Sequence, residues 1–461
     1  MGRINPWVKE KLVEAAKRGS PLRYIVEVVP DKRQRVKSQL ITLPNLNLIS
    51  QPADRFITVE APPELVETIS AIPGVVLVSA ETLAWIKSPI PFLGIPTPLE
   101  TFRAVTKFDP WLGQVKVSPI EIPVNPAQAA ILSPVRALTL NSIIVFTTEN
   151  QRNYIRAPNE NKVKTKGAVA DTGCTIPHFL LHPNSRVHLI SVIPFEPLPF
   201  DGLGHGQWCS TCAFGDDAIH PRWGRCEGVA DPEEFMHVKC LSNMGFGMTS
   251  WVLEAIYRAW EWGAKVLSMS LGGPLQGSVF DDPECRLISV LKDEMIVAVA
   301  AGNEGPEAYT VGSPGMCPDA VTVGAWSMTD NKVSYFSSRG SAEFYKEHPE
   351  VWDKDYSQRG EDMIKPDVCA PGGGRYNKED KDEQILSGVT GWYDPYGDVL
   401  PGWGIMKGTS MATPACAGLL TLACDNGLIK TAADVKRKMS KFAGKNSEVG
   451  YGLVTWDKLQ D

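Results

Sequence analysis

The stretch Gly408-Thr409-Ser410-Met411-Ala412-Thr413-Pro414 places a serine at the start of a run of small and apolar residues. This run predicts a helix over residues 411–424. The first N–H groups of a helix have no partner within it, and the N-terminus carries a partial positive charge, so an anion developing beside the Ser410 hydroxyl is favoured. Ser410 is therefore the candidate nucleophile, although a serine here also fits a simple helix cap.

A serine hydroxyl needs a base to take its proton and a carboxylate to orient that base, and both occur upstream. Residues 164–174 predict a buried strand that ends at Asp171, and open α/β sheets bind ligands at that edge. His205 lies among glycines in Gly202-Leu203-Gly204-His205-Gly206, where the backbone can approach a substrate. Each residue alone fits an ordinary turn or loop. Together they make Asp171 the candidate orienting group and His205 the candidate base.

The chain order Asp171, His205, Ser410 is the order found in subtilisin. The segments that resemble the subtilisin-like serine proteases (subtilases, peptidase family S8) are Ala168-Val-Ala-Asp171-Thr-Gly, Gly204-His205-Gly206, Val299-Ala-Ala-Gly302-Asn303-Glu-Gly and Gly408-Thr-Ser410-Met-Ala-Thr-Pro. With weaker matches between them, the resemblance covers roughly residues 165–455. It implies a hydrolase active in proteolysis, a serine-type endopeptidase that cleaves polypeptide substrates through an acyl-enzyme.

The resemblance also implies the rest of the site. Asn303 and the backbone N–H of Ser410 would form the oxyanion hole. The substrate-binding positions would be Gly245, Phe246, Gly247, Ser270, Leu271, Gly272, Gly273, Ala300, Ala301 and Gly302. The segment 245–247 would pair with the substrate as an added strand.

An α/β fold is predicted because strand patterns at 266–270, 295–300 and 320–324 alternate with helical ones such as 250–263. The resemblance implies three layers with a mostly parallel sheet between helices. One departure follows the histidine, where subtilases continue with Thr-His and this chain reads Gln207-Trp208-Cys209-Ser210-Thr211-Cys212. The packing around His205 must then differ, and a bulky Trp208 could alter substrate access. An alternative function is a catalytically impaired subtilase that acts in binding or assembly.

The chain divides into four predicted segments. Residues 1–21 form a helix that begins at Asn5-Pro6. Residues 22–87 follow a ferredoxin-like βαββαβ pattern. Residues 88–162 are a proline-rich linker or extension, and residues 163–461 are the catalytic domain.

By resemblance, residues 22–87 would be a propeptide of a self-processing zymogen. It would act as intramolecular inhibitor and chaperone, with the cut within or shortly before the linker. An unrelated α+β interaction domain is the alternative for this region.

Charge and hydropathy argue against a nucleic-acid-binding protein and against a membrane-spanning one. The 461 residues include 46 basic and 53 acidic ones, a net charge of −7, and no basic run suited to phosphates, which argues against nucleic-acid binding. No run of about eighteen apolar residues predicts a membrane span. The N-terminus lacks the apolar core of a signal peptide, so we expect a cytoplasmic or non-classically exported protein.

The ten cysteines and the acidic insertions leave the question of cofactors open. Cys209 and Cys212, with His220 and Cys226, fit a zinc site weakly, and structural thiols or a disulfide are the alternatives. Residues 341–364 and 377–403 predict surface loops. Their carboxylates fit either structural calcium or a solvated acidic face: Asp355, Glu361, Asp362, Glu379, Asp380 and Asp382. No metal ligand is assigned in the site, and no cofactor is expected for catalysis.

Overall fold

Short runs of Val, Ala, Ile and Leu form the central sheet of the computed structural model, which describes residues 2–9, 21–86, 143–183, 186–390 and 402–461. Within these residues the sheet has eight strands. In spatial order they are β10(Val187–Ser191), β14(Phe235–Lys239), β9(Gly167–Asp171), β16(Val266–Met269), β18(Ile296–Ala300), β19(Val321–Ser327) and β20(Lys332–Val333), with β21(Val368–Pro371) also beside β19. Every pair is parallel except β19 with β20. The predicted mostly parallel sheet is confirmed.

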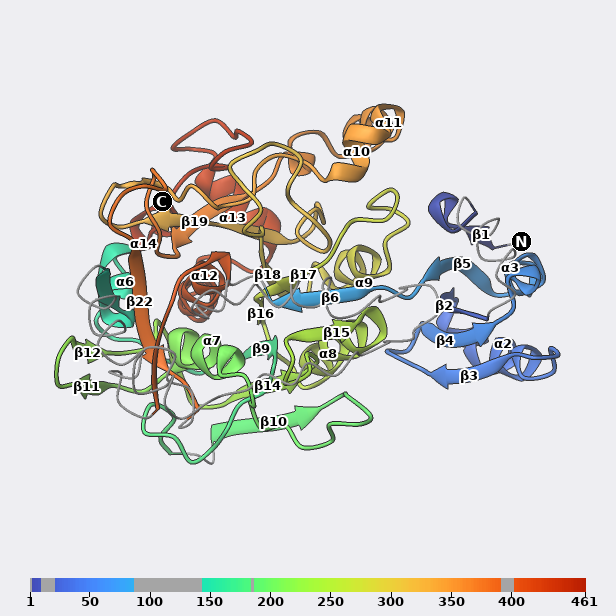
Figure 1. Ribbon diagram of the computed structural model, residues 1–461, viewed down its shortest axis with the longest axis horizontal. Coiled ribbons are helices and arrows are strands. Elements are labelled where there is room, and N and C mark those ends of the chain that lie inside the picture. Colours follow the sequence, from blue (N-terminus) through green and yellow to red (C-terminus); the bar gives the residue numbers. More distant parts are fainter. Residues whose placement is uncertain (1, 10–20, 87–142, 184–185, 391–401) are drawn as a thin grey trace, which may run out of the picture.

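Helices cover both faces of this sheet (Figure 1). One layer contains α7(His205–Phe214) and α12(Thr409–Asp425), and the other contains α8(Thr249–Glu261) and α9(Pro283–Leu291). Successive residues of a strand point to opposite faces. In β9, Val169 therefore packs with α7 and α12, whereas Ala168 and Ala170 pack with α8 and α9. The predicted three-layer α/β architecture is confirmed.

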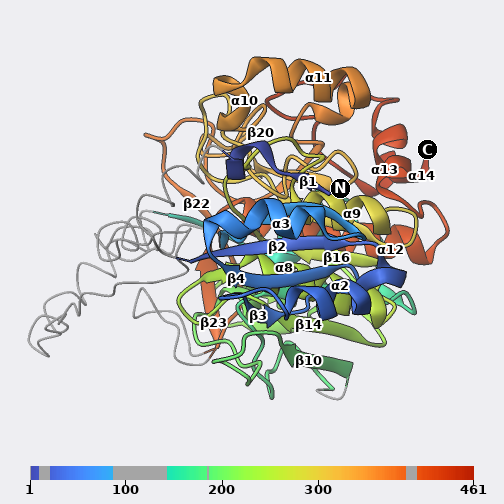
Figure 2. The ribbon, with the colours of Figure 1, turned by 90° about the vertical axis from the view of Figure 1, so that its right-hand side faces the viewer.

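The N-terminal domain has the predicted βαββαβ order. Its elements are β2(Leu22–Val28), α2(Arg33–Leu40), β3(Asn47–Ser50), β4(Phe56–Ala61), α3(Val66–Ala71) and β5(Val75–Ala80). These strands are antiparallel in the order β5-β2-β4-β3, and the short β1(Arg3–Ile4) adds a parallel edge beside β5. Tyr24 and Val26 pack against α2 and α3, while Ile25 joins the core of the larger domain. The two helices thus lie on the outer side of this small sheet (Figure 2).

The segment after β5 continues into the larger domain as β6(Leu83–Ile86). β6 lies between β15(Phe246–Met248) and β17(Leu271–Gly272) and is antiparallel to both. In Figure 1 it is the blue arrow that extends from the N-terminal domain toward β16 and β18. The two domains therefore share a three-stranded sheet, which no local sequence pattern predicts.

The helix predicted near the N-terminus begins as expected. Residues 6–9 are helical, and the Asn5 side chain accepts the N–H of Trp7 at 3.0 Å, which caps the helix. Residues 10–20 lie outside the described residues. So do residues 87–142, most of the proline-rich segment.

Residues 143–162 carry regular structure rather than an extended connection. β7(Ile144–Thr147) is followed by α6(Thr148–Tyr154), where Thr147 and Asn150 form a capping box. β7 pairs with β22(Glu383–Gly388), which pairs on its other side with β23(Trp403–Met406). This part of the chain therefore packs onto the larger domain.

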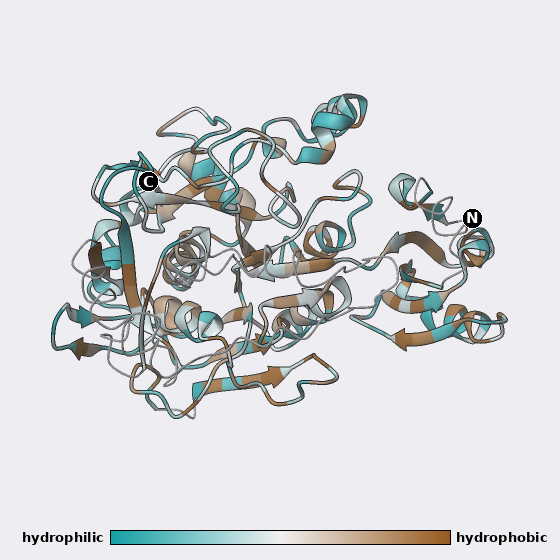
Figure 3. Ribbon diagram, in the orientation of Figure 1, coloured by the Kyte–Doolittle hydropathy of each residue, from teal (hydrophilic) through white to brown (hydrophobic). Residues whose placement is uncertain are grey.

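The prediction that residues 341–364 and 377–403 are loops is wrong where the structure describes them; residues 391–401 lie outside the described residues. Residues 341–364 contain α10(Glu343–Glu347) and α11(Pro349–Arg359), where Pro349 occupies the first helical turn. The surface of α11 is mostly hydrophilic (Figure 3). In residues 377–403, β22 is buried along its whole length because β7 and β23 flank it. The high charge of both segments favoured a loop prediction. Their helices and strand form through contacts with residues distant in the chain, which local sequence does not show.

None of the helices within the described residues is long and apolar enough to span a bilayer. All ten cysteines are described, and no disulfide joins them; nine are buried and Cys424 is partly exposed. The chain thus uses these residues as buried thiols in the core.

Candidate active site

Asp171 and His205 form a hydrogen-bonded pair that is closed to solvent. Asp171 ends β9 and His205 begins α7, with 0% and 1% of their surfaces exposed. The Nδ1–H of His205 donates to Asp171 Oδ1 over 2.7 Å, so Nε2 is the ring atom that can accept a proton. Burial alone would raise the pKa of Asp171, but the charge and hydrogen bond of His205 hold that pKa below its usual value. The aspartate is thus an anion that orients the imidazole.

A second buried carboxylate, Asp201, fixes the turn that carries His205. Its Oδ1 accepts the N–H groups of Leu203 and Gly204 at 2.9 and 2.8 Å, and its Oδ2 accepts that of Gln207 at 2.7 Å. Asp201 therefore caps the N-terminus of α7. Burial still raises its pKa above the usual value despite these donors. Sequence reasoning missed Asp201, although an acidic residue four positions before His205 is a recognisable capping signal.

Ser410 is the second residue of α12 and is fully buried. Pro414, four residues later, has no N–H to offer the carbonyl of Ser410. That carbonyl instead accepts the Ser270 hydroxyl at 2.9 Å and the Cys209 thiol at 3.6 Å. The Ser410 hydroxyl in turn donates to the Ser270 carbonyl at 3.2 Å. The segment between β16 and β17 therefore holds the serine through both its main chain and its side chain.

The Nε2 atom of His205 makes no hydrogen bond to any described residue. The Ser410 hydroxyl is bonded to Ser270 rather than to this nitrogen. Hydrogen bonds between a nucleophile and its base are often long or misaligned until substrate is bound. A change of the serine rotamer is therefore the step that would connect the hydroxyl to Nε2.

Asn303 is oriented by the residue that precedes Ser410. Its Oδ1 accepts the backbone N–H and the hydroxyl of Thr409 at 2.9 and 3.1 Å. The same hydroxyl accepts the N–H of Gly302 at 3.2 Å. Because Thr409 holds the oxygen, the amide nitrogen of Asn303 is the end of the side chain that can donate to an oxyanion.

Most of the predicted substrate-binding positions lie on or beside the two strands that flank β6. Gly245 precedes β15, which contains Phe246 and Gly247, and Ser270 and Gly273 flank Leu271 and Gly272 of β17. Ala300 ends β18, and Ala301 and Gly302 follow it, with Gly302 bonded to Thr409.

Two of these glycines allow close approach of the main chains. A Cβ at Gly273 would lie 2.4 Å from the Leu83 carbonyl oxygen, and one at Gly247 would lie 2.3 Å from that of Cys240. The space between β15 and β17, here called the cleft, thus holds an extended segment of the chain itself, β6.

The departure after His205 leaves the helix intact. Residues 205–214 form α7, in which Trp208 is fully buried and donates from Nε1 to the Gly404 carbonyl at 3.1 Å. Its ring packs in the core with α12, so it does not restrict substrate access. The altered sequence thus changes the core through Trp208 and reaches the candidate site through the Cys209 thiol, which contacts the Ser410 carbonyl.

One group of metal-binding side chains within the described residues coincides with the candidate site. Donor atoms of Asp171, His205 and Cys209 lie within 4.8 Å of one another. However, Nδ1 of His205 is already bonded to Asp171, and burial raises the pKa of the Cys209 thiol well above its ordinary value. A neutral thiol is a poor ligand, so this set fits a catalytic pair better than a metal site. Cys212, His220 and Cys226 do not join it.

Three of the six acidic side chains considered for calcium have protein partners. Asp355 is buried and accepts the hydroxyls of Ser278 and Tyr345 at 2.7 and 2.8 Å. Asp362 and Asp382 form ion pairs, with Lys436 at 3.2 Å and Lys407 at 2.8 Å respectively. These three carboxylates are therefore engaged by side chains of the protein itself.

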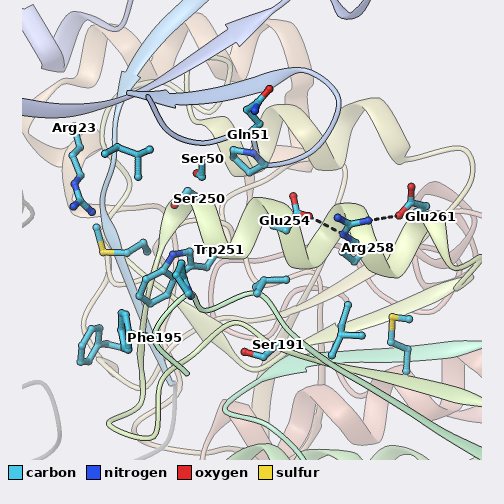
Figure 4. A pocket seen from close by; sticks show the side chains of 18 of the residues that line it. Arg23, Ser50, Gln51, Ser191, Phe195, Ser250, Trp251, Glu254, Arg258 and Glu261 are labelled. Atoms are coloured by element: carbon cyan, nitrogen blue, oxygen red, sulfur yellow. Dashed lines mark hydrogen bonds and ion pairs between the residues drawn. The ribbon is translucent and has the colours of Figure 1, made fainter. Parts of the chain in front are cut away.

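A cavity of about 980 Å³ lies between the two domains and not at the serine. Figure 4 shows Arg23, Ser50 and Gln51 of the N-terminal domain on one side, and Trp251 and other residues of α8 on the other. None of the three candidate catalytic side chains lines it. The domain interface is therefore incompletely packed beside the cleft.

Comparison with known proteins agrees with this arrangement. The sequence profile of the subtilase family matches residues 164–452. The chain is 29% identical to serine protease AprX of Bacillus subtilis over 301 residues, which are 60% of this chain and 61% of AprX. It is 30% identical to subtilisin E of Bacillus subtilis over 298 residues, 63% of this chain and 64% of that protein. With pyrolysin of Pyrococcus furiosus the identity is 32% over 229 residues, 47% of this chain and 15% of pyrolysin. The match thus spans less than two thirds of each relative. Because the family profile covers more than half of the chain, the protein belongs to the subtilase family.

Proposed function

We propose that the protein is a serine endopeptidase that is made as a self-processing zymogen. His205 takes the proton of Ser410 through Nε2, and the serine oxygen attacks the substrate carbonyl. Asp171 stabilises the imidazolium that forms. Asn303 and the Ser410 N–H bind the oxyanion, the amine leaves with the proton from His205, and water releases the acyl group. Nucleophile, base and oxyanion donors all belong to the chain, so we expect no cofactor in catalysis.

The observation that carries this proposal is the position of β6 in the cleft. Phe246 and Gly247 of β15 pair with Trp85 and Ala84, and Gly272 of β17 pairs with Trp85. A peptide substrate that adds a strand to a sheet makes this kind of main-chain pairing. The N-terminal domain therefore acts as an intramolecular inhibitor, because β6 fills the place of the substrate.

The register of β6 indicates the region of the cut. Ile86 pairs with Leu271, and the residue before Leu271 is Ser270, whose carbonyl accepts the Ser410 hydroxyl. In an antiparallel pair β6 therefore runs toward the end of β17 that lies beside Ser410. We place the cleaved bond shortly after Ile86, the last described residue of β6.

Polar contacts hold the inhibitory domain in place. Glu27 accepts two hydrogen bonds from Arg286 of α9, one of them 3.0 Å from Nη2 to Oε1. The Ala53 N–H donates to Glu254 of α8 at 2.9 Å. An interface of polar contacts beside a cavity can dissociate once the connecting bond is cut. The domain would also assist folding, because β6 completes the sheet that β15 and β17 begin.

Active-site labelling tests the proposal. A fluorophosphonate probe should label the wild type after self-processing, and casein should be degraded, whereas Ser410→Ala should show neither reaction. Thr413→Ser offers a matched control and should react like the wild type, because it removes a methyl group from the same helix and keeps the hydroxyl that donates to the Thr409 carbonyl. If the wild type neither reacts with the probe nor degrades casein, the chain is a catalytically impaired subtilase that acts in binding or assembly.

A further inference from the structure

A buried histidine that the mechanism does not use, His237, lies directly behind the candidate catalytic pair. It occupies the middle of β14, next to β9 in the sheet, where His237 pairs with Val169 and Lys239 pairs with Asp171. Its side chain is fully buried. Phe235, two residues earlier and therefore on the same face of the strand, packs against Phe214 of α7, with ring centroids 5.4 Å apart. His237 thus faces the helix that begins with His205.

Both ring nitrogens of His237 have partners. Nε2 accepts the backbone N–H of Gly173 at 3.1 Å, and Nδ1 is 2.8 Å from the Ser210 hydroxyl. A backbone N–H can only donate, so Nε2 carries no proton and Nδ1–H donates to Ser210. One tautomer of a neutral imidazole therefore satisfies both bonds.

These two bonds connect the segments that carry the catalytic pair. Gly173 follows Asp171 by two residues, and Ser210 lies in the same helix as His205. The segments are close: a Cβ at Gly206 would lie 2.4 Å from the Gly173 carbonyl oxygen and 3.0 Å from Cε1 of His237. The imidazole of His237 therefore spans the same gap between strand and helix as the bond from Asp171 to His205.

The imidazole of His237 carries no positive charge that would compete with His205 for the carboxylate of Asp171. Burial, with smaller contributions from the charges of Lys239 and His205, lowers the pKa of His237 to about 3, although the charge of Asp171 acts in the opposite direction. His237 is thus uncharged near neutral pH, and its two hydrogen bonds do not change with protonation there.

We propose that His237 is a positioning residue of the catalytic site: beside the direct bond from Gly206 to Thr172, it is a further tie between the end of β9 and α7 and so helps to set the distance between Asp171 and His205. This inference rests on the proposed function, because it concerns the geometry of the same pair. His237 touches no substrate. Its effect is exerted through Gly173 and Ser210.

Two substitutions test the tie. His237→Leu has a similar volume but leaves the Gly173 N–H and the Ser210 hydroxyl without this partner. A misplacement of about 1 Å at a reacting group can lower a rate by roughly 10²-fold, so we expect kcat to fall between about tenfold and a hundredfold. KM should change by less than about twofold, because the cleft strands are untouched. His237→Gln keeps a polar group that can reach these partners and should recover most of kcat.

The matched control is Val238→Ala, which lies on the same strand but packs on the opposite face of the sheet, toward α8. It should lower stability without lowering kcat per folded molecule. The folded fraction is measured by circular dichroism, so a general loss of stability is separated from a loss at the pair.

A spectroscopic measurement does not depend on turnover. In the Ser410→Ala full-length chain, the proton between Asp171 and His205 should give a far-downfield nuclear magnetic resonance signal. His237→Leu should shift or broaden this signal, while Val238→Ala and His237→Gln should keep it. The inference is overturned if His237→Leu leaves the signal and kcat as in Val238→Ala, or if His237→Gln is as impaired as His237→Leu. If the wild type fails to react with a fluorophosphonate, the proposed function is lost, and the signal still tests the tie by itself.

Discussion

Glu27→Gln should release the inhibitory domain from the catalytic domain. Glu27 is only 4% exposed and bonds to Arg286 through both oxygens. Hydrogen bonds to charged groups contribute about 1.5–3 kcal/mol each. Arg286 keeps its bond to the Phe280 carbonyl at 2.9 Å and is 22% exposed, so it is not left without a partner. We therefore expect the substitution to reduce the binding free energy between the two domains by about 2 kcal/mol, which is a roughly 30-fold higher Kd.

The assay uses the complex that self-cleavage leaves behind. A dilution series of the cleaved protein, followed by fluorophosphonate labelling, gives the fraction of free catalytic domain and thus the Kd. Glu60→Gln is the matched control, because Glu60 pairs with Arg23 at 3.5 Å and both side chains are more than a quarter exposed. Such surface pairs contribute about 0–1 kcal/mol, so Kd should rise less than about fivefold. Equal effects of the two substitutions would refute the assigned interface.

Three further substitutions test other parts of the structure. Burial raises the pKa of Glu81 while the inhibitory domain is bound, so the bound domain holds this proton more tightly than the free domain does. The affinity of the inhibitory domain for the catalytic domain should therefore fall as pH rises from acid to neutral. Glu81→Gln should flatten this dependence in the dilution assay. In Gly247→Ala the new Cβ would lie 2.3 Å from the Cys240 carbonyl oxygen. Overpacking of this kind costs about 1–3 kcal/mol and would displace β15, so KM for peptides should rise at least fivefold. An unchanged KM would contradict the pairing role of β15. Trp208→Phe leaves the buried Gly404 carbonyl without the indole donor, so the free energy of unfolding measured in urea should fall by about 1–3 kcal/mol while kcat per folded molecule stays unchanged. A loss of kcat at unchanged stability would place Trp208 at the active site.

Local patterns were sufficient for the central strands and helices of the larger domain. The predicted strand at 266–270 is β16, and the predicted helices at 250–263 and 411–424 are α8 and α12. Apolar runs and glycine-rich turns specify such elements without help from distant residues. The βαββαβ order of the N-terminal domain followed from the same signals.

Contacts between distant residues could not be predicted in the same way. Leu83–Ile86 is a strand only because β15 and β17, more than 150 residues later, flank it. The buried β22 lies in an acidic segment, and its order depends on β7 and β23. The bonds of His237 likewise depend on the tertiary arrangement, whereas the capping role of Asp201 is local and was recognisable in the sequence. The candidate catalytic residues were accessible from motifs, and a supporting group contributed by another strand was not.

The central claim is that Ser410 cuts the chain that occupies its own cleft. The most direct measurement is the intact mass of the purified wild type and of Ser410→Ala over time. We expect the wild type to separate into an N-terminal fragment that ends shortly after residue 86 and the remaining catalytic fragment, while Ser410→Ala keeps its full length. A wild type that stays intact, or a mutant that is cut at the same bond, would contradict the account.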